Sequence, residues 1–367
     1  MSDKNFFYCF LLEALSVSKA ENSFKFQKKN GEGIMNSYEV SEKAGVSIAT
    51  VSRVLNGNPN VSEPTRQKVL NVMKEIGYTP NVFARGLGLN TMHTIGIMCA
   101  DSSDPFLANA VYYLEQNLRK CGYDSFLCCT GYDLINKQKY LQLLLSKRVD
   151  AIILVGSSFL EAAKKDNAYI TAAADTIPVM VINGYLNHQN VFCTLCDDYQ
   201  AVYDVVNRLI EQDRKNILYL YTSRSYSGLQ KLSGYKNSIA SNNLTIREDL
   251  MLTCPNDIVQ TKELLIEQYN NGLRFDAVVA SEDQLAVAAM KFAKHVGLSV
   301  PEDLLIVGYN NSILSSCTDP EITTIDNHVE TLCMTTINTL MRVLDGNDVP
   351  NKTTISNDLV IRETTNF

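Results

Sequence analysis

Residues 38–55, YEVSEKAGVSIATVSRVL, decide the fold of the N-terminal part of this chain. Their small and apolar side chains are spaced so that two short helices pack together at a sharp angle. Gly45 stands where the chain must turn, at a position where a positive φ costs glycine little. The residues expected on the buried side are Val40, Ala44, Val46, Val51 and Val54.

The second of these helices carries an outer face that fits a DNA groove. Ser47 is expected to cap its N-terminus, because a serine oxygen can accept a hydrogen bond from a free N–H of the first turn. Ile48, Ala49, Ser52 and Arg53 then lie on the outer face. This arrangement predicts a helix-turn-helix whose second helix enters a major groove, and the alternative is an ordinary helical hairpin.

Two further segments extend this N-terminal part. A third helix is expected from Ser62 to Gly77, with a proline in its first turn and an apolar stripe along one side. Residues 81–88, NVFARGLG, follow another proline and are expected to be helical only when paired or bound. Leu87 projects from this segment and suits a wedge between base steps in a minor groove.

Composition limits the classes of protein to consider. With 367 residues, 46% of them hydrophobic and 20% charged, the chain is expected to form roughly two or three domains. The net charge of −7 argues against a protein that coats nucleic acid nonspecifically. Residues 35–90 nevertheless carry more basic than acidic side chains, and the rest of the chain after them is acidic. A basic N-terminal segment followed by a long acidic segment suits a DNA-binding module attached to a larger domain.

No cofactor and no metal are expected. The four histidines are isolated, and Cys193 and Cys196, although spaced as CxxC, have no second pair or histidine near them. The ten cysteines are expected to be reduced thiols, which is typical of a cytoplasmic protein. The apolar stretch near the N-terminus is too short to span a membrane.

Residues 1–34 are expected to lie outside the folded protein. They lack helical or strand periodicity, and Met35 stands directly before the helix-turn-helix. Residues 28–34, KKNGEGI, are also what a purine-rich ribosome-binding site would encode if it were translated. The hypothesis is that translation starts at Met35, and the alternative is a disordered or partner-binding arm. The intact mass of protein made from the native locus distinguishes the two.

From Thr94 onward, buried strands alternate with amphipathic helices. Strands are expected at 95–99, 124–129, 149–155, 179–182, 217–221, 277–280 and 304–307. Helices are expected at 107–120, 136–146, 200–212, 231–241 and 284–296. This alternation predicts parallel, doubly wound sheets, and its length predicts two lobes with a ligand cleft between them.

Taken together, YEVSEKAGVSIATVSRVLNG, VSEPTRQKV and IGYTPNVFARGL resemble the DNA-binding segment of the lactose-repressor (LacI/GalR) family of bacterial transcription regulators. The resemblance implies that Ile48, Ala49 and Arg53 read bases and that Leu87 is the intercalating hinge leucine. The chemistry agrees, since an arginine can bond guanine O6 and N7 bidentately and apolar side chains can contact a thymine methyl. The residues expected to position the phosphate backbone are Ser47, Thr50 and Asn56.

The rest of the chain resembles the effector-binding core of the same family, which is similar to periplasmic sugar-binding proteins. The matching segments are IGIMCADSSDPFL, LLLSKRVDAIIL, PVMVING, SGYKNSI, SEDQLAVAAM, VPEDLLIVGYNNS, ITTIDN and NDLVIRET. The fold implied is an all-α helix-turn-helix DNA-binding domain plus an α/β two-lobed, periplasmic-binding-protein-like core. No heptad repeat that would form a tetramer follows the final expected strand, so a homodimer is expected.

The expected domain boundaries follow from these two matches. The DNA-binding domain covers residues 35–80, and a hinge covers residues 81–93, after the N-terminal extension at 1–34. The N-lobe of the core is expected at 94–193 and 328–354. The C-lobe is expected at 194–327 and 355–367.

The expected cleft departs from the family's sugar-binding pattern. Lys231 stands in KLSGY where members that bind sugars usually have an arginine. A lysine ammonium cannot donate the paired, planar hydrogen bonds that an arginine guanidinium donates to sugar hydroxyl groups. Glu282 stands directly before Asp283, where other members of the family often have an asparagine. Lys231 and Glu282 either pair with each other or face a ligand. The cleft therefore predicts a polar small molecule rather than an ordinary sugar, with a sugar derivative among the candidates. The residues expected to bind the effector are Asp101, Asp104, Phe106, Lys231, Glu282, Asn310 and Asn327.

The function expected is that of a sequence-specific transcriptional regulator. It is expected to act as a repressor that binds a pseudo-palindromic double-stranded DNA operator as a dimer and responds to an effector in the cleft. Control by a phosphocarrier-type partner protein is an alternative, because ARGL in the hinge looks like the catabolite-control members of the family. A solute-binding receptor shares the two-lobed core, but the DNA module and the lack of an export signal argue against it. An enzyme is not expected, since neither a P-loop nor a GxSxG motif with ordered partners is present.

Overall fold

The structure, a computed structural model, describes residues 37–55, 57–78 and 91–367. These residues belong to two compact units, a helical unit within Met1–Gly88 and an α/β unit within Leu89–Phe367. In these described ranges no helix is long and apolar enough to cross a membrane.

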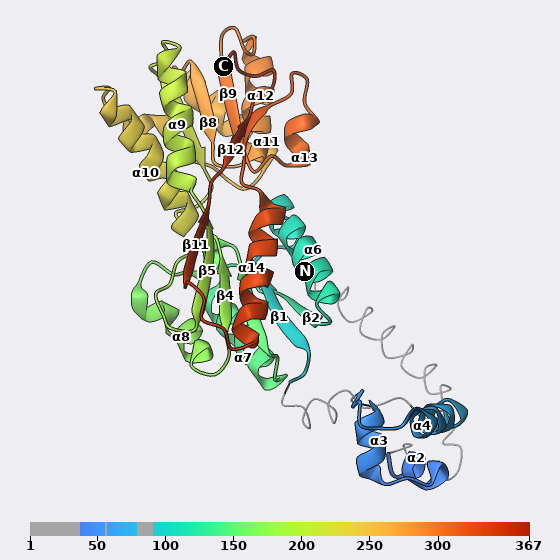
Figure 1. Cartoon of the computed structure of the whole chain (residues 1–367). Helices are drawn as coiled ribbons and strands as arrows, with labels where there is room; N and C mark the ends of the chain where they lie inside the picture. Colours follow the sequence, from blue (N-terminus) through green and yellow to red (C-terminus); the bar gives the residue numbers. More distant parts are fainter. Residues whose placement is uncertain (1–36, 56, 79–90) are drawn as a thin grey trace, which may run out of the picture. The chain divides into compact units, whose positions relative to one another are not determined.

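The described part of the helical unit consists of α2 (Ser37–Ala44), α3 (Ile48–Leu55) and α4 (Glu63–Ile76) (Figure 1). Gly45 has a φ of +62°, which confirms the predicted turn between α2 and α3. The unit's core contains four of the five residues expected to be buried, Val40, Ala44, Val51 and Val54. Val46 is only half-buried, because it lies in the turn and packs against the edge of this core.

The ends of α3 and α4 follow the predicted capping residues. The Thr50 backbone N–H donates to Ser47 Oγ at 3.2 Å, which confirms Ser47 as the cap of α3. Gly77 ends α4 in the left-handed conformation, with a φ of +66°. Local sequence chemistry therefore sets the turn, the start of α3 and the end of α4.

The α/β unit contains two six-stranded sheets. The first, with strand order β11-β5-β4-β3-β1-β2, is parallel throughout; its strands are β1 (Thr94–Cys99), β2 (Asp124–Cys129), β3 (Ala151–Val155), β4 (Val179–Ile182), β5 (Val191–Cys196) and β11 (Lys352–Ile355). The second, with order β12-β10-β9-β8-β6-β7, is parallel except for β12; its strands are β6 (Ile217–Tyr221), β7 (Met251–Thr253), β8 (Ala277–Ala280), β9 (Leu305–Tyr309), β10 (Thr323–Asp326) and β12 (Asp358–Val360). We call the first sheet and its helices the N-lobe, and the second sheet and its helices the C-lobe.

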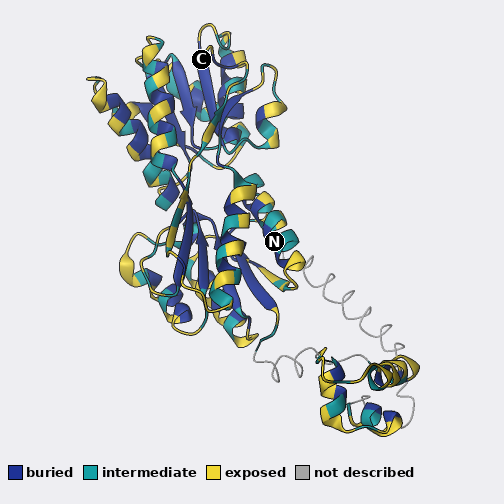
Figure 2. Ribbon diagram, in the orientation of Figure 1, coloured by how far each residue is buried: buried dark blue, intermediate teal, exposed yellow. Residues whose placement is uncertain are grey.

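Helices cover both faces of each sheet, and the central strands are buried between them (Figure 2). In the N-lobe, α6 (Pro105–Lys120) and α14 (Val329–Leu344) pack together on one face, while α7 (Leu134–Ser146) and α8 (Ala168–Ala174) cover the other. In the C-lobe, α9 (Asp198–Glu211) pairs with α10 (Tyr226–Ser241), and α11 (Ile258–Asn270) pairs with α12 (Asp283–Val296). Shorter helical segments are α13 (Ile313–Ser316) and the 3₁₀ turns at Ser157–Phe159, Lys164–Asn167 and Glu248–Leu250. This architecture confirms the predicted pair of parallel, doubly wound sheets.

Several predicted boundaries differ from the structure. The helix expected at 231–241 begins at Tyr226, because Ser225 Oγ accepts from the Gly228 N–H at 3.3 Å and so caps an earlier start. The helices expected from 107, 136, 200 and 284 likewise begin earlier, the strand expected from 149 begins later, and the strand expected at 304–307 extends to Tyr309. The elements β5, β7, β10, β11, α8, α11, α13 and α14 were not predicted. The buried side of α14 does not form a continuous apolar stripe in the sequence, because it includes polar residues such as Thr336, which is fully buried.

The chain crosses between the lobes from β5 to α9, from β10 to α14 and from β11 to β12. The lobe boundary expected after residue 193 falls inside β5, which continues to Cys196. Both lobes contribute residues that follow the carboxyl ends of their parallel strands to the cavity described next.

Candidate functional site

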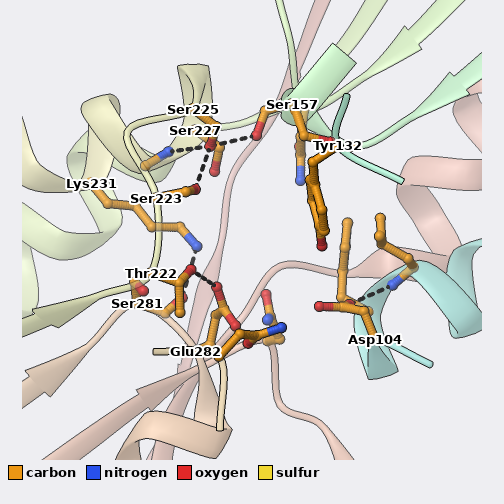
Figure 3. A pocket seen from close by; sticks show the side chains of 18 residues that line it. Asp104, Tyr132, Ser157, Thr222, Ser223, Ser225, Ser227, Lys231, Ser281 and Glu282 are labelled. Carbon is orange, nitrogen blue, oxygen red and sulfur yellow. Dashed lines mark hydrogen bonds between the residues drawn. The ribbon is translucent and has the colours of Figure 1, made fainter. Parts of the chain in front are cut away.

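A cavity of about 330 Å³ lies between the two lobes (Figure 3). The N-lobe residues that line it come from segments after β1, β2, β3 and β4, and the C-lobe residues come from segments after β6, β7, β8 and β9. Parallel α/β sheets commonly place ligands in the crevice outside the carboxyl ends of their strands. The cavity therefore has the position, the size and the polar lining of a small-molecule site.

The structure brings five of the seven predicted effector residues to this cavity, namely Asp104, Phe106, Lys231, Glu282 and Asn310. Asp101 does not line it, because its Oδ1 accepts from the backbone N–H and the hydroxyl of Ser103 at 2.8 and 2.7 Å. Asn327 is only 1% exposed and lies behind the wall, where its amide donates to Asn310 Oδ1 at 2.8 Å. These two residues shape segments next to the cavity instead of facing it.

Of the two alternatives for Lys231 and Glu282, an ion pair or a ligand-facing position, the structure favours the second, because both line the cavity and no ion pair joins these two described residues. The Lys231 ammonium donates to the Ser281 backbone carbonyl at 3.0 Å and lies 3.4 Å from the centroid of the Tyr309 ring. The lysine is 7% exposed, so this cation–π contact is largely shielded from water. The pairing alternative is therefore wrong: Lys231 is held within the C-lobe by a backbone carbonyl and an aromatic face.

Two carboxylates face the cavity from different lobes. Burial raises the pKa of Glu282, although a hydrogen bond from the Thr222 hydroxyl at 2.8 Å and the charge of Lys231 act in the opposite direction. Burial also raises the pKa of Asp104, whose Oδ1 accepts from the Leu107 N–H at 2.9 Å and caps α6. Both carboxyl groups therefore hold protons more tightly than they would in water.

Asp198 lies next to Lys231 and was not predicted as part of the site. It accepts hydrogen bonds from the Ser227 hydroxyl at 2.5 Å and from the Tyr309 hydroxyl. Complete burial raises the pKa of Asp198 despite these bonds and the nearby charge of Lys231. Across the described ranges of the chain, no group of three or more His, Cys, Asp or Glu side chains is placed to hold a metal ion.

Most hydroxyl and amide side chains of the cavity were also missed from the sequence. They are Tyr132, Ser157, Ser158, Asn183, Thr222, Ser223, Ser225, Ser227, Asn256 and Ser281. The Ser157 hydroxyl donates to Ser225 Oγ at 2.9 Å and joins the two lobes directly. Their common signal is position, since most follow the last residue of a buried strand within a few residues.

The outer face of α3 is arranged as predicted in the helical unit. Ile48, Ala49, Ser52 and Arg53 are exposed on it, and Ile48 is 38% exposed despite its apolar side chain. At the start of α3, the hydroxyls of Ser47 and Thr50 lie 2.9 Å apart. An exposed apolar residue beside an arginine on one helix face suits contact with base edges. Two further predicted DNA contacts, Asn56 and Leu87, lie outside the described residues.

Comparison with known proteins finds matches to two parts of the chain. Residues 38–81 match the family described as bacterial regulatory proteins, lacI family, and residues 92–363 match periplasmic binding proteins and sugar binding domain of LacI family. An HTH-type transcriptional regulator of Lachnoclostridium phytofermentans is 72% identical over 333 residues, which cover 91% of this chain and 100% of that protein. Catabolite control protein A of Priestia megaterium is 30% identical and covers 78% of this chain and 86% of its own length.

Solved structures share the fold. The lac repressor dimer bound to operator and the anti-inducer ONPF has a TM-score of 0.81 at 24% identity, covering 90% of this chain and 99% of that chain. The transcriptional regulator CelR–cellobiose complex has a TM-score of 0.67 at 24% identity, covering 90% and 100%.

Proposed function

Because the chain belongs to the lacI family of bacterial regulatory proteins and is a DNA-binding transcriptional regulator, we propose that a small polar molecule in the interlobe cavity controls its affinity for a DNA operator. The observation that carries this proposal is the cavity itself, which is lined by polar residues of both lobes. A ligand that contacts both lobes favours the lobe arrangement that fits it best, and it shifts the population toward that arrangement.

DNA reading is assigned to α3. Arg53, Ile48 and Ala49 contact base edges, because they lie together on the exposed face of this helix. Ser47 and Thr50, at its N-terminus, contact phosphates, where free backbone N–H groups also favour an anion. Two copies of the chain bind a pseudo-palindromic operator and repress transcription, with Leu87 as the minor-groove wedge of the hinge.

The DNA assignment is tested on a binding site selected from random duplexes. Fluorescence anisotropy of the full chain gives its affinity for the selected site and for random DNA. Arg53→Ala is expected to weaken specific binding by about 1–3 kcal/mol and to relax preference at one base pair. Lys74→Ala is the matched control, since it removes an equal charge from an exposed position on α4. An Arg53→Ala protein with an unchanged ratio of specific to random affinity contradicts the assignment.

Control by the cavity is tested with the same operator. Small polar molecules and phosphocarrier proteins are screened for their effect on operator affinity, in the wild type and in Glu282→Gln. A small molecule whose effect is reduced by Glu282→Gln supports the proposal. An effect of a phosphocarrier protein alone, equal in both proteins, contradicts it and favours control by a protein partner.

A further inference from the structure

We propose that the ligand of the interlobe cavity is a protonated amine that also carries several hydroxyl groups, as an amino sugar does. The inference rests on the proposed function and specifies its ligand. It separates such amines from neutral hexoses and from phosphorylated sugars, which offer the cavity no charge or a negative charge.

The charges of the cavity favour a cation. Among the described residues that line it, Asp104 and Glu282 are acidic and Lys231 is the single basic residue. The ammonium of Lys231 already contacts the Ser281 carbonyl and the Tyr309 ring, and the fully buried carboxylate of Asp198 lies near it. Because the positive charge is held within the C-lobe, the two carboxylates dominate the charge that a ligand meets.

The two carboxylates also keep capacity to accept hydrogen bonds. Asp104 uses Oδ1 to cap α6 through the Leu107 N–H, and the backbone N–H of Phe106 also acts on this carboxyl group. Glu282 receives a hydrogen bond from Thr222 at 2.8 Å and a long one from Gln284 at 3.3 Å. An ionised carboxylate offers about four lone-pair sites, so an ammonium group can bind each of them without displacing these partners.

Tyr132 lies in the part of the cavity where the carboxylates make the electrostatic potential negative. Its side chain points into the cavity beside Asp104 (Figure 3). Tyr132 is 57% exposed, and its partial desolvation together with the charges of Asp104, Asp101 and Glu282 raises its pKa. The ring of Tyr132 and that of Phe106 offer aromatic faces to a cation or to the apolar face of a sugar ring.

A buried hydroxyl without a partner points independently to a bound ligand. Ser281 is 5% exposed and lines the cavity, and within the described chain its Oγ has no hydrogen-bond partner. A buried hydroxyl is normally satisfied, so a ligand group that donates or accepts there completes the wall. The lining hydroxyls Ser157, Ser158, Ser223 and Ser225 extend this match to a molecule with several hydroxyl groups.

Isothermal titration calorimetry of the full chain at neutral pH tests the inference. The panel pairs D-glucosamine with D-glucose, D-galactosamine with D-galactose and D-mannosamine with D-mannose, and adds the N-acetylated amines and glucose 6-phosphate. At least one free amine is expected to bind on the order of tenfold more tightly than its neutral partner, since each carboxylate adds a charge-assisted hydrogen bond. N-acetylation is expected to remove this advantage.

Variants tie the preference to the named carboxylates. Glu282→Gln and Asp104→Asn are each expected to lower the affinity for the amine on the order of tenfold, with little effect on the neutral hexose. Asp101→Asn is the matched control, because Asp101 lies nearby but does not line the cavity. Equal or tighter binding of a neutral or phosphorylated sugar overturns the inference and leaves the proposed function standing. A panel without any binder also overturns it, and the operator screen then decides the proposed function separately.

Discussion

Replacing Lys231 with methionine tests whether this buried cation supports the C-lobe side of the cavity. Methionine keeps most of the length of the side chain, so packing changes little, but the charge and its donors are lost. The substitution leaves the Ser281 carbonyl without its donor and removes the cation that lies on the Tyr309 ring. Asp198 and Glu282 then lack the nearby positive charge that opposes the effect of their burial.

The expected size of the effect follows from these contacts. A hydrogen bond from a charged group contributes about 1.5–3 kcal/mol, and a desolvated cation–π contact contributes up to about 2 kcal/mol. Methionine recovers part of this loss, because burying an ammonium group is itself costly. We expect a net loss of about 2–3 kcal/mol in the free energy of unfolding at neutral pH, or a fall in Tm of about 5–10 °C.

The loss should depend on pH in a defined direction. Lys231 lowers the pKa of Asp198, Glu282 and Asp104, so its removal raises these folded-state values further above their unfolded values. A carboxyl group with a raised folded-state pKa stabilises the fold below its unfolded pKa and loses that contribution as pH rises through the folded pKa. The deficit of Lys231→Met should therefore be largest at neutral pH and shrink as acid protonates these groups.

Scanning calorimetry of the full chain at pH 7.5 and at pH 5 measures both effects. Lys236→Met is the matched control, since Lys236 lies on the same helix and pairs with the exposed Glu248 at 3.4 Å. Its effect is expected to stay within about 0.5 kcal/mol. A Lys231→Met protein as stable as the control, or one with the same deficit at both pH values, would show that Lys231 does not stabilise the C-lobe through its charge.

Three further substitutions give expected outcomes. Gly234→Ala places a Cβ 2.3 Å from the Tyr199 carbonyl oxygen, so α9 and α10 must separate, and the free energy of unfolding is expected to fall by about 1–3 kcal/mol. Urea unfolding measures this loss against Ser233→Ala, a control at an exposed position, and equal unfolding midpoints would count against the contact. Glu282→Gln removes a buried charge whose pKa is raised, so it should raise the Tm at neutral pH and have less effect in acid; a fall in Tm at neutral pH would show that the charge is needed. Gly45→Ala forces a φ of +62° on alanine and should destabilise the helical unit by about 1–3 kcal/mol and weaken operator binding; unchanged thermal unfolding of that unit would exclude strain at the turn.

The features predicted correctly from the sequence depend on neighbours in the chain. Gly45 specified the turn of the helix-turn-helix, and Ser47 specified the start of α3, because both act through their own backbone or the first helical turn. The central strands were recognisable because β1, β3, β6 and β8 are buried at every position and read as continuous apolar runs.

The features that were missed depend on distant contacts. The partners of Lys231, a carbonyl at Ser281 and the ring of Tyr309, are brought together only by the order of strands in the second sheet. The hydroxyl groups of the cavity give no periodic signal, since they lie in segments after strand ends. Asp101 and Asp104 looked equivalent in DSSDPF, but one stabilises a turn with Ser103 and the other caps α6 and lines the cavity.

Control of DNA binding through the cavity requires that operator and ligand affect each other's affinity reciprocally. Calorimetry measures the affinity of the full chain for the cavity ligand, alone and saturated with the selected operator duplex. Binding free energies are linked, so the operator must change ligand affinity by the same factor by which the ligand changes operator affinity. We expect equal factors, of about 5–150-fold for typical coupling. A ligand affinity that is the same with and without operator would exclude control of DNA binding through the cavity.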